Sequence, residues 1–203
     1  MGNSHSNDGG MISIPTHSLS SAHLHVVLLG LDQAGKTAAL YRLKFGEFVA
    51  TAPTIGFNTE KLRLPSLSGP ATAFHLWDVG GQDRLRPLWR SYARQADGFI
   101  FVVDSTDEER LEEACDELQR LTRLPEGRGV PLLVLASKQD VSGALTATEL
   151  EKVLRLADLG PTAAWHVEPT SSVTGRGLVE GLDKLRELII MRRKALKQNG
   201  RQR

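Results

Sequence analysis

Gly30-Leu31-Asp32-Gln33-Ala34-Gly35-Lys36-Thr37 matches G-x-x-x-x-G-K-[ST], the pattern of a phosphate-binding loop. An apolar run, residues 26–29, precedes the octet, and a helix-forming stretch, residues 38–48, follows it. The glycines permit a tight turn that points backbone N–H groups at phosphate oxygens. The lysine supplies a positive charge to the terminal phosphates, and the threonine hydroxyl suits magnesium. The octet therefore predicts a nucleotide site with Mg²⁺ at a strand–loop–helix junction.

The bulk composition is that of one globular domain with short tails. The chain has 203 residues, of which 40% are hydrophobic and 24% charged, and its net charge is +1. This balance argues against a nucleic-acid partner. Cys115 is the single cysteine, which excludes an internal disulfide and fits a reducing cytosol. No run of 18 apolar residues is present, so we expect no transmembrane helix.

Strand-like and helix-like stretches alternate along the chain, which predicts an α/β fold with a six-stranded, mostly parallel sheet and helices on both faces. The expected strands are residues 25–29, 58–64, 73–77, 98–103, 131–135 and 164–167. The expected helices are residues 36–48, 86–94, 107–123, 146–156 and 177–197. The second and third strands read as a hairpin joined by residues 65–70. The Glu- and Arg-rich stretch 107–123 predicts a solvated helix face.

A second motif, Asp78-Val79-Gly80-Gly81-Gln82, follows the third expected strand. An acid at a strand end can hold a magnesium-bound water. Gly81 can offer its backbone N–H to a terminal phosphate, and Gln82 can orient an attacking water. In the loop before the hairpin, Thr54 can add a second hydroxyl to magnesium. Alone, the loop around Thr54 is better read as an ordinary Pro-Thr turn, and Asp-Gly pairs are also common in turns, so the phosphate-binding octet gives both patterns their weight.

A third motif, Ser137-Lys138-Gln139-Asp140, closes the fifth expected strand. The carboxylate of Asp140 can accept two hydrogen bonds from the N1–H and N2–H₂ edge of guanine, whereas adenine offers no such donor pair. The stem of Lys138 can pack on the base. After the sixth expected strand, the backbone of Ser172 and Val173 can present an N–H to the guanine oxygen. An isolated K-x-D is more often a solvated loop, so the guanine assignment depends on the strand position.

These motifs, in this order, resemble the small GTPases of the ADP-ribosylation factor (ARF) family, over about residues 24–191. The stretches that carry the resemblance, besides the octet, are residues 53–58, 77–82 and 85–92. Residues 41–48, residues 57–61, the long 65–70 insertion and the basic tail are most similar to the fourth ARF-like subgroup.

The resemblance implies a GDP/GTP switch in which Thr54 and Gly81 hold the terminal phosphate and the adjoining segments rearrange after hydrolysis. It implies slow hydrolysis that depends on an activating protein, an exchange factor for loading, and effectors that read the aromatic trio Phe57, Trp77 and Tyr92. The same three residues also read as half-buried packing residues. Cytohesin-type exchange factors are candidate effectors, and we expect a monomer.

Ser137 departs from the family, which carries asparagine at this position. Serine has a shorter reach and one donor, so losing one or two hydrogen bonds should weaken nucleotide affinity about ten- to a hundredfold. Together with Asp32, at a position where faster GTPases carry glycine, this keeps an alternative open: a hydrolysis-poor, fast-exchanging GTP-loaded adaptor. A third reading, an ATP-using kinase, is disfavoured by Asp140 and by the absence of a second substrate domain.

Both termini carry membrane-binding signals. Residues 1–23 read as a mobile arm, and its start fits M-G-x-x-x-[ST], which predicts N-myristoylation of Gly2. One myristoyl chain gives only marginal attachment, so a second signal is needed. The tail 192–203 can supply it on anionic lipid through its basic residues, Arg192, Arg193, Lys194, Lys197, Arg201 and Arg203. A nuclear-import receptor is the rival reader of this cluster. We expect the cytoplasmic face of the plasma membrane, the cytoplasm and the nucleus as locations.

Overall fold

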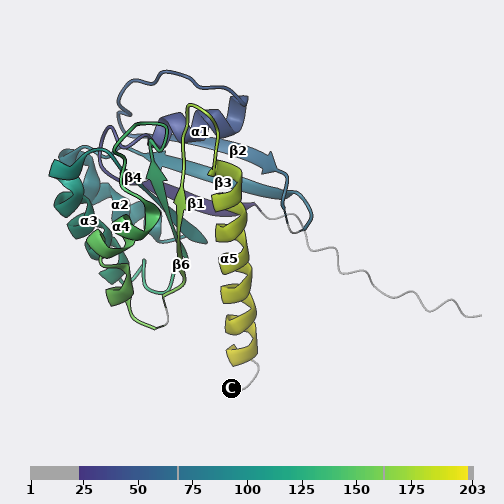
Figure 1. The fold of residues 1–203 in the computed structure, drawn as a ribbon. Helices are drawn as coiled ribbons and strands as arrows, with labels where there is room; N and C mark the ends of the chain where they lie inside the picture. Colours follow the sequence, from purple (N-terminus) through teal and green to yellow (C-terminus); the bar gives the residue numbers. More distant parts are fainter. Residues whose placement is uncertain (1–22, 68, 162, 201–203) are drawn as a thin grey trace, which may run out of the picture.

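A computed structural model describes residues 23–67, 69–161 and 163–200, with side chains up to residue 198. One twisted sheet forms the centre, with the strand order β2-β3-β1-β4-β5-β6 (Figure 1). The strands are β1 (Leu24–Leu29), β2 (Phe57–Leu64), β3 (Thr72–Val79), β4 (Gly98–Asp104), β5 (Leu132–Ser137) and β6 (Trp165–Pro169). Only β2 and β3 pair antiparallel, so the predicted fold class of a six-stranded, mostly parallel sheet is confirmed.

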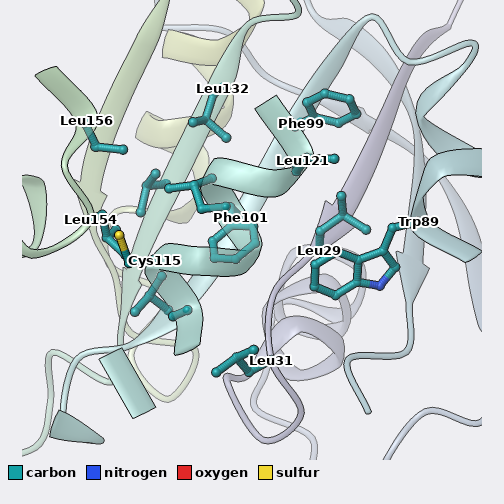
Figure 2. Packing of buried hydrophobic residues seen from close by; sticks show 14 of the residues in the cluster. Leu29, Leu31, Trp89, Phe99, Phe101, Cys115, Leu121, Leu132, Leu154 and Leu156 are labelled. Atoms are coloured by element: carbon teal, nitrogen blue, oxygen red, sulfur yellow. The ribbon is translucent and has the colours of Figure 1, made fainter. Parts of the chain in front are cut away.

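Helices cover both faces of the sheet. The α-helices are α1 (Lys36–Phe45), α2 (Trp89–Ala93), α3 (Leu111–Arg123), α4 (Ala147–Val153) and α5 (Leu178–Gly200), and the 3₁₀-helices are η1 (Asp83–Leu88), η2 (Glu108–Arg110) and η3 (Leu156–Leu159). Strand side chains point alternately to the two faces. Val27 and Leu29 face the core under α2, α3 and α4 (Figure 2), whereas Val26 and Leu28 face the core under α1 and α5.

The expected helices differ from the structure at several ends. The α-helix α3 begins at Leu111, after η2, rather than at residue 107, and α4 ends at Val153 rather than at residue 156. The first helix was expected to reach residue 48, but α1 ends at Phe45 because Gly46 adopts a left-handed conformation (φ 76°) that stops the helix. The second was expected over residues 86–94. The structure instead has the 3₁₀-helix η1 before the short α2, and Pro87 lies inside η1. Proline lacks the N–H that an α-helix needs in its interior.

The expected arm and tail are only partly described. Residues 1–22, including Gly2, lie outside the described residues, as do Arg201 and Arg203. The tail residues 192–200 continue α5 without a break, so this helix projects beyond the sheet (Figure 1). Within the described ranges, no helix has the length and apolar character needed to span a membrane.

Candidate nucleotide-binding site

A cavity of about 290 Å³ lies over the predicted phosphate-binding loop, beyond the carboxyl end of β1. Ligands in open α/β sheets bind at this edge, so the location agrees with the fold. The cavity brings together segments that are far apart in the sequence, and its lining residues are Asp32, Gln33, Gly35, Lys36, Thr37, Thr51, Ala52, Pro53, Thr54, Gly81 and Gln82.

The loop is shaped for close approach of an anion. Gly35 has φ 97° at the start of α1, a conformation that favours glycine, and it leaves the first N–H groups of the helix facing the cavity. Gly30 also has a positive φ, and a Cβ there would lie 2.2 Å from the Val102 carbonyl oxygen. The Lys36 ammonium donates to the carbonyl oxygens of Gly30 (3.0 Å) and Leu31 (2.7 Å), so it is held within the loop.

Three oxygen-bearing side chains meet at the floor of the cavity. The Thr37 hydroxyl donates to Asp78 Oδ2 (2.6 Å), and Thr54 Oγ1 lies 2.7 Å from Thr37 Oγ1 and 3.3 Å from the same carboxylate oxygen. Asp78 Oδ1 is buried and has no hydrogen-bond partner among the described residues. Burial raises the pKa of Asp78, against the hydrogen bonds and the Lys36 charge, which lower it. Hard oxygen donors of this kind suit Mg²⁺.

The segments on the two sides of the β2–β3 hairpin contact each other and the phosphate-binding loop. Gly80 N–H donates to the Gly56 carbonyl (2.9 Å), and the Trp89 indole N–H donates to the Gly80 carbonyl (3.0 Å). A Cβ at Gly81 would lie 2.3 Å from the Gly30 carbonyl oxygen, so only glycine fits there. The predicted phosphate ligands Thr54 and Gly81 are therefore both at the cavity.

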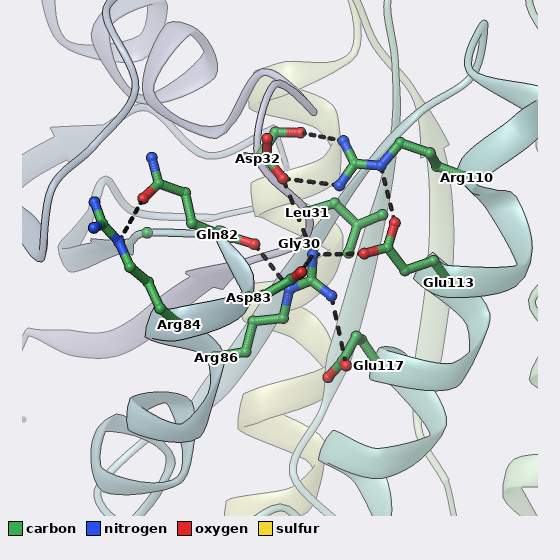
Figure 3. A network of polar contacts seen from close by, with 12 residues as sticks. Gly30, Leu31, Asp32, Gln82, Asp83, Arg84, Arg86, Arg110, Glu113 and Glu117 are labelled. Carbon is green, nitrogen blue, oxygen red and sulfur yellow. Dashed lines mark hydrogen bonds and ion pairs between the residues drawn. The ribbon is translucent and has the colours of Figure 1, made fainter.

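A charged network that the sequence analysis missed holds Asp32 (Figure 3). Arg110 donates to the Asp32 carboxylate (2.8 Å) and to Glu113 (2.9 Å). Arg86 Nη2 lies 2.7 Å from the Glu113 carboxylate, and Arg86 Nε donates to the Gly81 carbonyl (2.8 Å). Burial would raise the pKa of Asp32, but the Arg110 contacts hold it below its ordinary value. Residues 107–123 were expected to form a solvated helix face, but two residues of this stretch, Arg110 and Glu113, support the site.

The predicted guanine-binding segment follows β5. Ser137 is buried, and its hydroxyl lies 2.7 Å from the Ala34 carbonyl and 2.9 Å from the Val103 carbonyl. One hydroxyl has one proton, so it donates fully to only one of them at a time. Lys138 forms an ion pair with Asp104. Burial would raise the pKa of Asp104, but hydrogen bonds from Lys138 and Thr106 keep it lowered.

The other guanine-site candidates lie beside this segment. Asp140 is exposed at the turn after β5. The Gln139 side chain donates to the Leu145 carbonyl (2.8 Å), whereas its backbone N–H donates to the Thr170 carbonyl (3.0 Å) and joins the loop after β6. Ser172 and Val173 lie in this second loop, and Val173 is half exposed. The two predicted base-binding loops are therefore neighbours.

The predicted effector residues form one cluster. The Phe57 and Trp77 rings stack with centroids 5.4 Å apart, and Tyr92 lies 5.5 Å from Phe57 and 5.9 Å from Trp77. Phe57 is 51% exposed, and the other two are partly buried. Packing and exposure therefore coexist in this trio.

Nucleotide affinity should fall as the pH rises above about 8. Burial lowers the pKa of Lys36 to about 8, against the raising effect of Asp78 and Asp32. Bound phosphate favours the ammonium form, so the pKa rises in the complex and binding takes up a proton above pH 8. We expect the GDP affinity to fall by nearly tenfold per pH unit at most, measured by titration between pH 7.5 and 9.

Lys36→Arg is the control for this pH dependence, because its guanidinium stays charged over the whole range. Any effect of guanine ionisation remains in both proteins. Calorimetry in two buffers of different ionisation enthalpy should show proton uptake by the wild type at pH 8.5. Equal pH dependence in both proteins, or no proton uptake, would contradict the role of Lys36.

Comparison with known proteins places this geometry in a family. The model of the ADP-ribosylation factor family matches residues 12–189. The human ADP-ribosylation factor-like protein 4C is 57% identical over 175 residues, covering 86% of this chain and 91% of its own. The human protein 4A is 51% identical over 191 residues (94% and 96%), and the human protein 4D is 54% identical over 184 residues (89% and 92%).

A solved structure agrees with these relatives. The Arl6 (BBS3) small GTPase from Trypanosoma brucei, with the bound nucleotide analogue GppNp, is 31% identical, with a TM-score of 0.72 over 84% of this chain and 99% of its own. The chain therefore belongs to the ADP-ribosylation factor family of small GTPases, which bind guanine nucleotides and hydrolyse GTP. The resemblance to the fourth ARF-like subgroup is confirmed.

Proposed function

We propose that this protein is a membrane-recruited GDP/GTP switch with slow intrinsic hydrolysis. The observation that carries the proposal is the position of Thr54 and Gly81. Thr54 precedes β2 and Gly81 follows β3 in the sequence, and both line one phosphate cavity. A terminal phosphate contacts both segments at once, and its loss releases both. The nucleotide state is thereby transmitted to the hairpin and to the aromatic trio on it.

Magnesium is the metal that this site supports. The hydroxyls of Thr37 and Thr54 lie next to each other, and Asp78 has a buried oxygen without a partner among the described residues. The hydroxyls of Thr37 and Thr54 would hold the ion, with the Asp78 carboxylate beside them, and a bound Mg²⁺ would neutralise charge on the phosphates. Lys36 and the N–H groups of the loop would hold the β- and γ-oxygens.

The two loops after β5 and β6 bind the guanine base. Asp140 accepts from the base edge, the stem of Lys138 packs against the ring, and the backbone at Ser172 and Val173 donates to the guanine oxygen. The ion pair between Lys138 and Asp104 supports this arrangement because it fixes the direction of the lysine stem.

The partners follow from the exposed surfaces. Effectors can read the trio Phe57, Trp77 and Tyr92, in which Phe57 is half exposed and the other two are partly buried. Cytohesin-type exchange factors are candidate effectors. An exchange factor loads GTP, and an activating protein accelerates hydrolysis. The protein acts as a monomer, because the switch needs no second copy.

Membrane recruitment combines two weak signals. Myristate on Gly2 supplies one. The end of α5 supplies the other, since Lys194 and Lys197 are exposed there, whereas Arg193 pairs with Asp97 (2.6 Å). Each basic residue near an anionic surface contributes about 1 kcal/mol. The cytoplasmic face of the plasma membrane is the main location that these signals favour. An import receptor that reads the same cluster would add a nuclear pool to the cytoplasmic one.

A hydrolysis-poor adaptor that exchanges nucleotide quickly is the second candidate. Two contacts favour it: Asp32 is fixed beside the phosphate cavity by Arg110, and the Gln82 carboxamide accepts from Arg84 Nε (3.1 Å). Single-turnover hydrolysis, with and without an activating protein, separates the two candidates. A turnover rate that no activating protein raises would favour the adaptor.

The proposal is tested by displacing fluorescent GDP with GTP, GDP and ATP at millimolar magnesium. We expect both guanine nucleotides to compete and ATP to fail, and removal of magnesium to speed release. Equal competition by ATP would overturn the guanine assignment.

Ser137→Asn should slow GDP release about ten- to a hundredfold. The longer amide carries two donors, so it can serve the Ala34 and Val103 carbonyls together, whereas the serine proton serves one. Ser172→Ala is the matched control, because only the backbone of Ser172 is expected to act. Stopped-flow release of fluorescent GDP measures both variants. If Ser137→Asn releases GDP as fast as the wild type, the serine does not accelerate GDP release.

A further inference from the structure

The loop between β2 and β3 is fastened to α5 by one buried carboxylate. The Ser66 hydroxyl donates to Asp183 Oδ1 (2.6 Å), and the Leu67 backbone N–H donates to Asp183 Oδ2 (3.2 Å). Arg186 Nε, one turn further along α5, donates to the same Oδ1 (2.9 Å). We call these four residues, Ser66, Leu67, Asp183 and Arg186, the loop anchor.

Polar contacts, rather than apolar burial, hold this loop in place. The Leu67 side chain is 69% exposed, whereas Asp183 and Arg186 are only 7% and 8% exposed. A buried carboxylate is tolerated when a cation and further donors surround it, and removing one of them leaves charge uncompensated. Separation of the loop from α5 would remove two donors from Asp183 at once. The anchor therefore resists displacement of the loop.

The β2–β3 hairpin connects the anchored loop to the phosphate cavity. The hairpin pairs without interruption from Leu64↔Thr72 beside the loop to Phe57↔Val79 beside the cavity. Thr54 lies three residues before β2, and Gly81 lies two residues after β3. Within the described sheet β2 is an edge strand whose strand neighbour is β3, and α1 contacts it through the Lys44–Glu60 ion pair and the Asn58–Tyr41 hydrogen bond. Because the rise is about 3.3 Å per residue, a shift of even one residue along the strand breaks the bond between Ser66 and Asp183.

We propose that Asp183 is a positioning residue that, through the loop anchor, keeps Thr54 and Gly81 at the phosphate cavity and so favours GTP over GDP. The inference rests on the proposed GDP/GTP switch. GTP has a terminal phosphate that uses both segments in the position seen here, whereas GDP gains nothing from it. A contact present in only one of two states shifts the preference toward the ligand of that state.

The test compares dissociation constants for GDP and for a non-hydrolysable GTP analogue in the full chain. Ser66→Ala removes the hydrogen bond from the Ser66 hydroxyl to Asp183, and Ser66 is a partly exposed loop residue, so the fold should persist. We expect the preference for the analogue over GDP to fall about two- to tenfold. Asp183→Asn should lower it further. Thr72→Ala is the control, because Thr72 lies at the end of the same loop, where its hydroxyl donates to the Pro70 carbonyl (3.4 Å) rather than to Asp183.

The outcomes separate this inference from the proposed function. A wild type that fails to discriminate guanine nucleotides from ATP would overturn the proposed function. If the wild type binds both guanine nucleotides and Ser66→Ala leaves their ratio unchanged, the anchor has no positioning role. An equal loss of affinity for both nucleotides would also overturn it, because a merely structural contact acts on both alike. The same ratio change in Thr72→Ala would assign the effect to the loop in general.

Discussion

Asp140→Asn should lower GTP affinity about a thousandfold and make xanthosine triphosphate the better ligand. A carboxylate accepts from both N1–H and the N2 amino group of guanine, whereas an amide turns one of these contacts into two facing donors. Loss of a charge-assisted pair costs about 4 kcal/mol, which is a factor of about a thousand. Xanthine carries a carbonyl in place of the amino group, so it accepts from the new amide. Competition against fluorescent GDP measures both effects.

The position of Asp140 makes this substitution a clean one. Its side chain is exposed at the turn after β5, so the fold does not depend on its charge. Asp158→Asn is the matched control, because it makes the same change at an exposed acid in η3. A GTP affinity within threefold of the wild type in Asp140→Asn would remove this residue from the base site.

The parts of the site that could be predicted are those with a local pattern. The octet, the residues from Asp78 to Gln82 and those from Ser137 to Asp140 each lie at the end of a strand, and the carboxyl ends of parallel strands meet at one edge. Their meeting in space therefore followed from the alternation of strands and helices. The end of α1 could also have been predicted, because glycine often terminates helices and Gly46 does so here. The prediction extended the helix to residue 48 because the helix-forming pattern continues beyond this glycine.

The contacts that could not be predicted join distant segments through single side chains. Arg110 lies 78 positions from Asp32, and Asp183 lies 117 positions from Ser66. Arg110 and Asp183 are surrounded by other charged residues, as on any solvated helix, so no local feature marks them. Which charges turn inward depends on how α3 and α5 pack, and that depends on the whole sheet.

Gln82→Leu should slow single-turnover GTP hydrolysis about a hundredfold while leaving GDP and GTP affinities nearly unchanged. The carboxamide can accept a hydrogen bond from the attacking water and donate one to the phosphate, and leucine of similar size can do neither. In the structure Gln82 lines the phosphate cavity, but its oxygen accepts from Arg84 (Figure 3). This exposed contact is worth less than about 1 kcal/mol, so releasing the carboxamide costs little.

Arg84→Ala is the partner experiment, because it removes the competing donor without touching the glutamine. We expect hydrolysis by this variant to be equal to that of the wild type or up to about threefold faster, as the freed carboxamide spends more time at the phosphate. Phosphate release from preloaded GTP, measured over one turnover, provides the rate for each variant. If Gln82→Leu hydrolyses GTP as fast as the wild type, water is not oriented by Gln82, and the adaptor reading becomes the better account of this site.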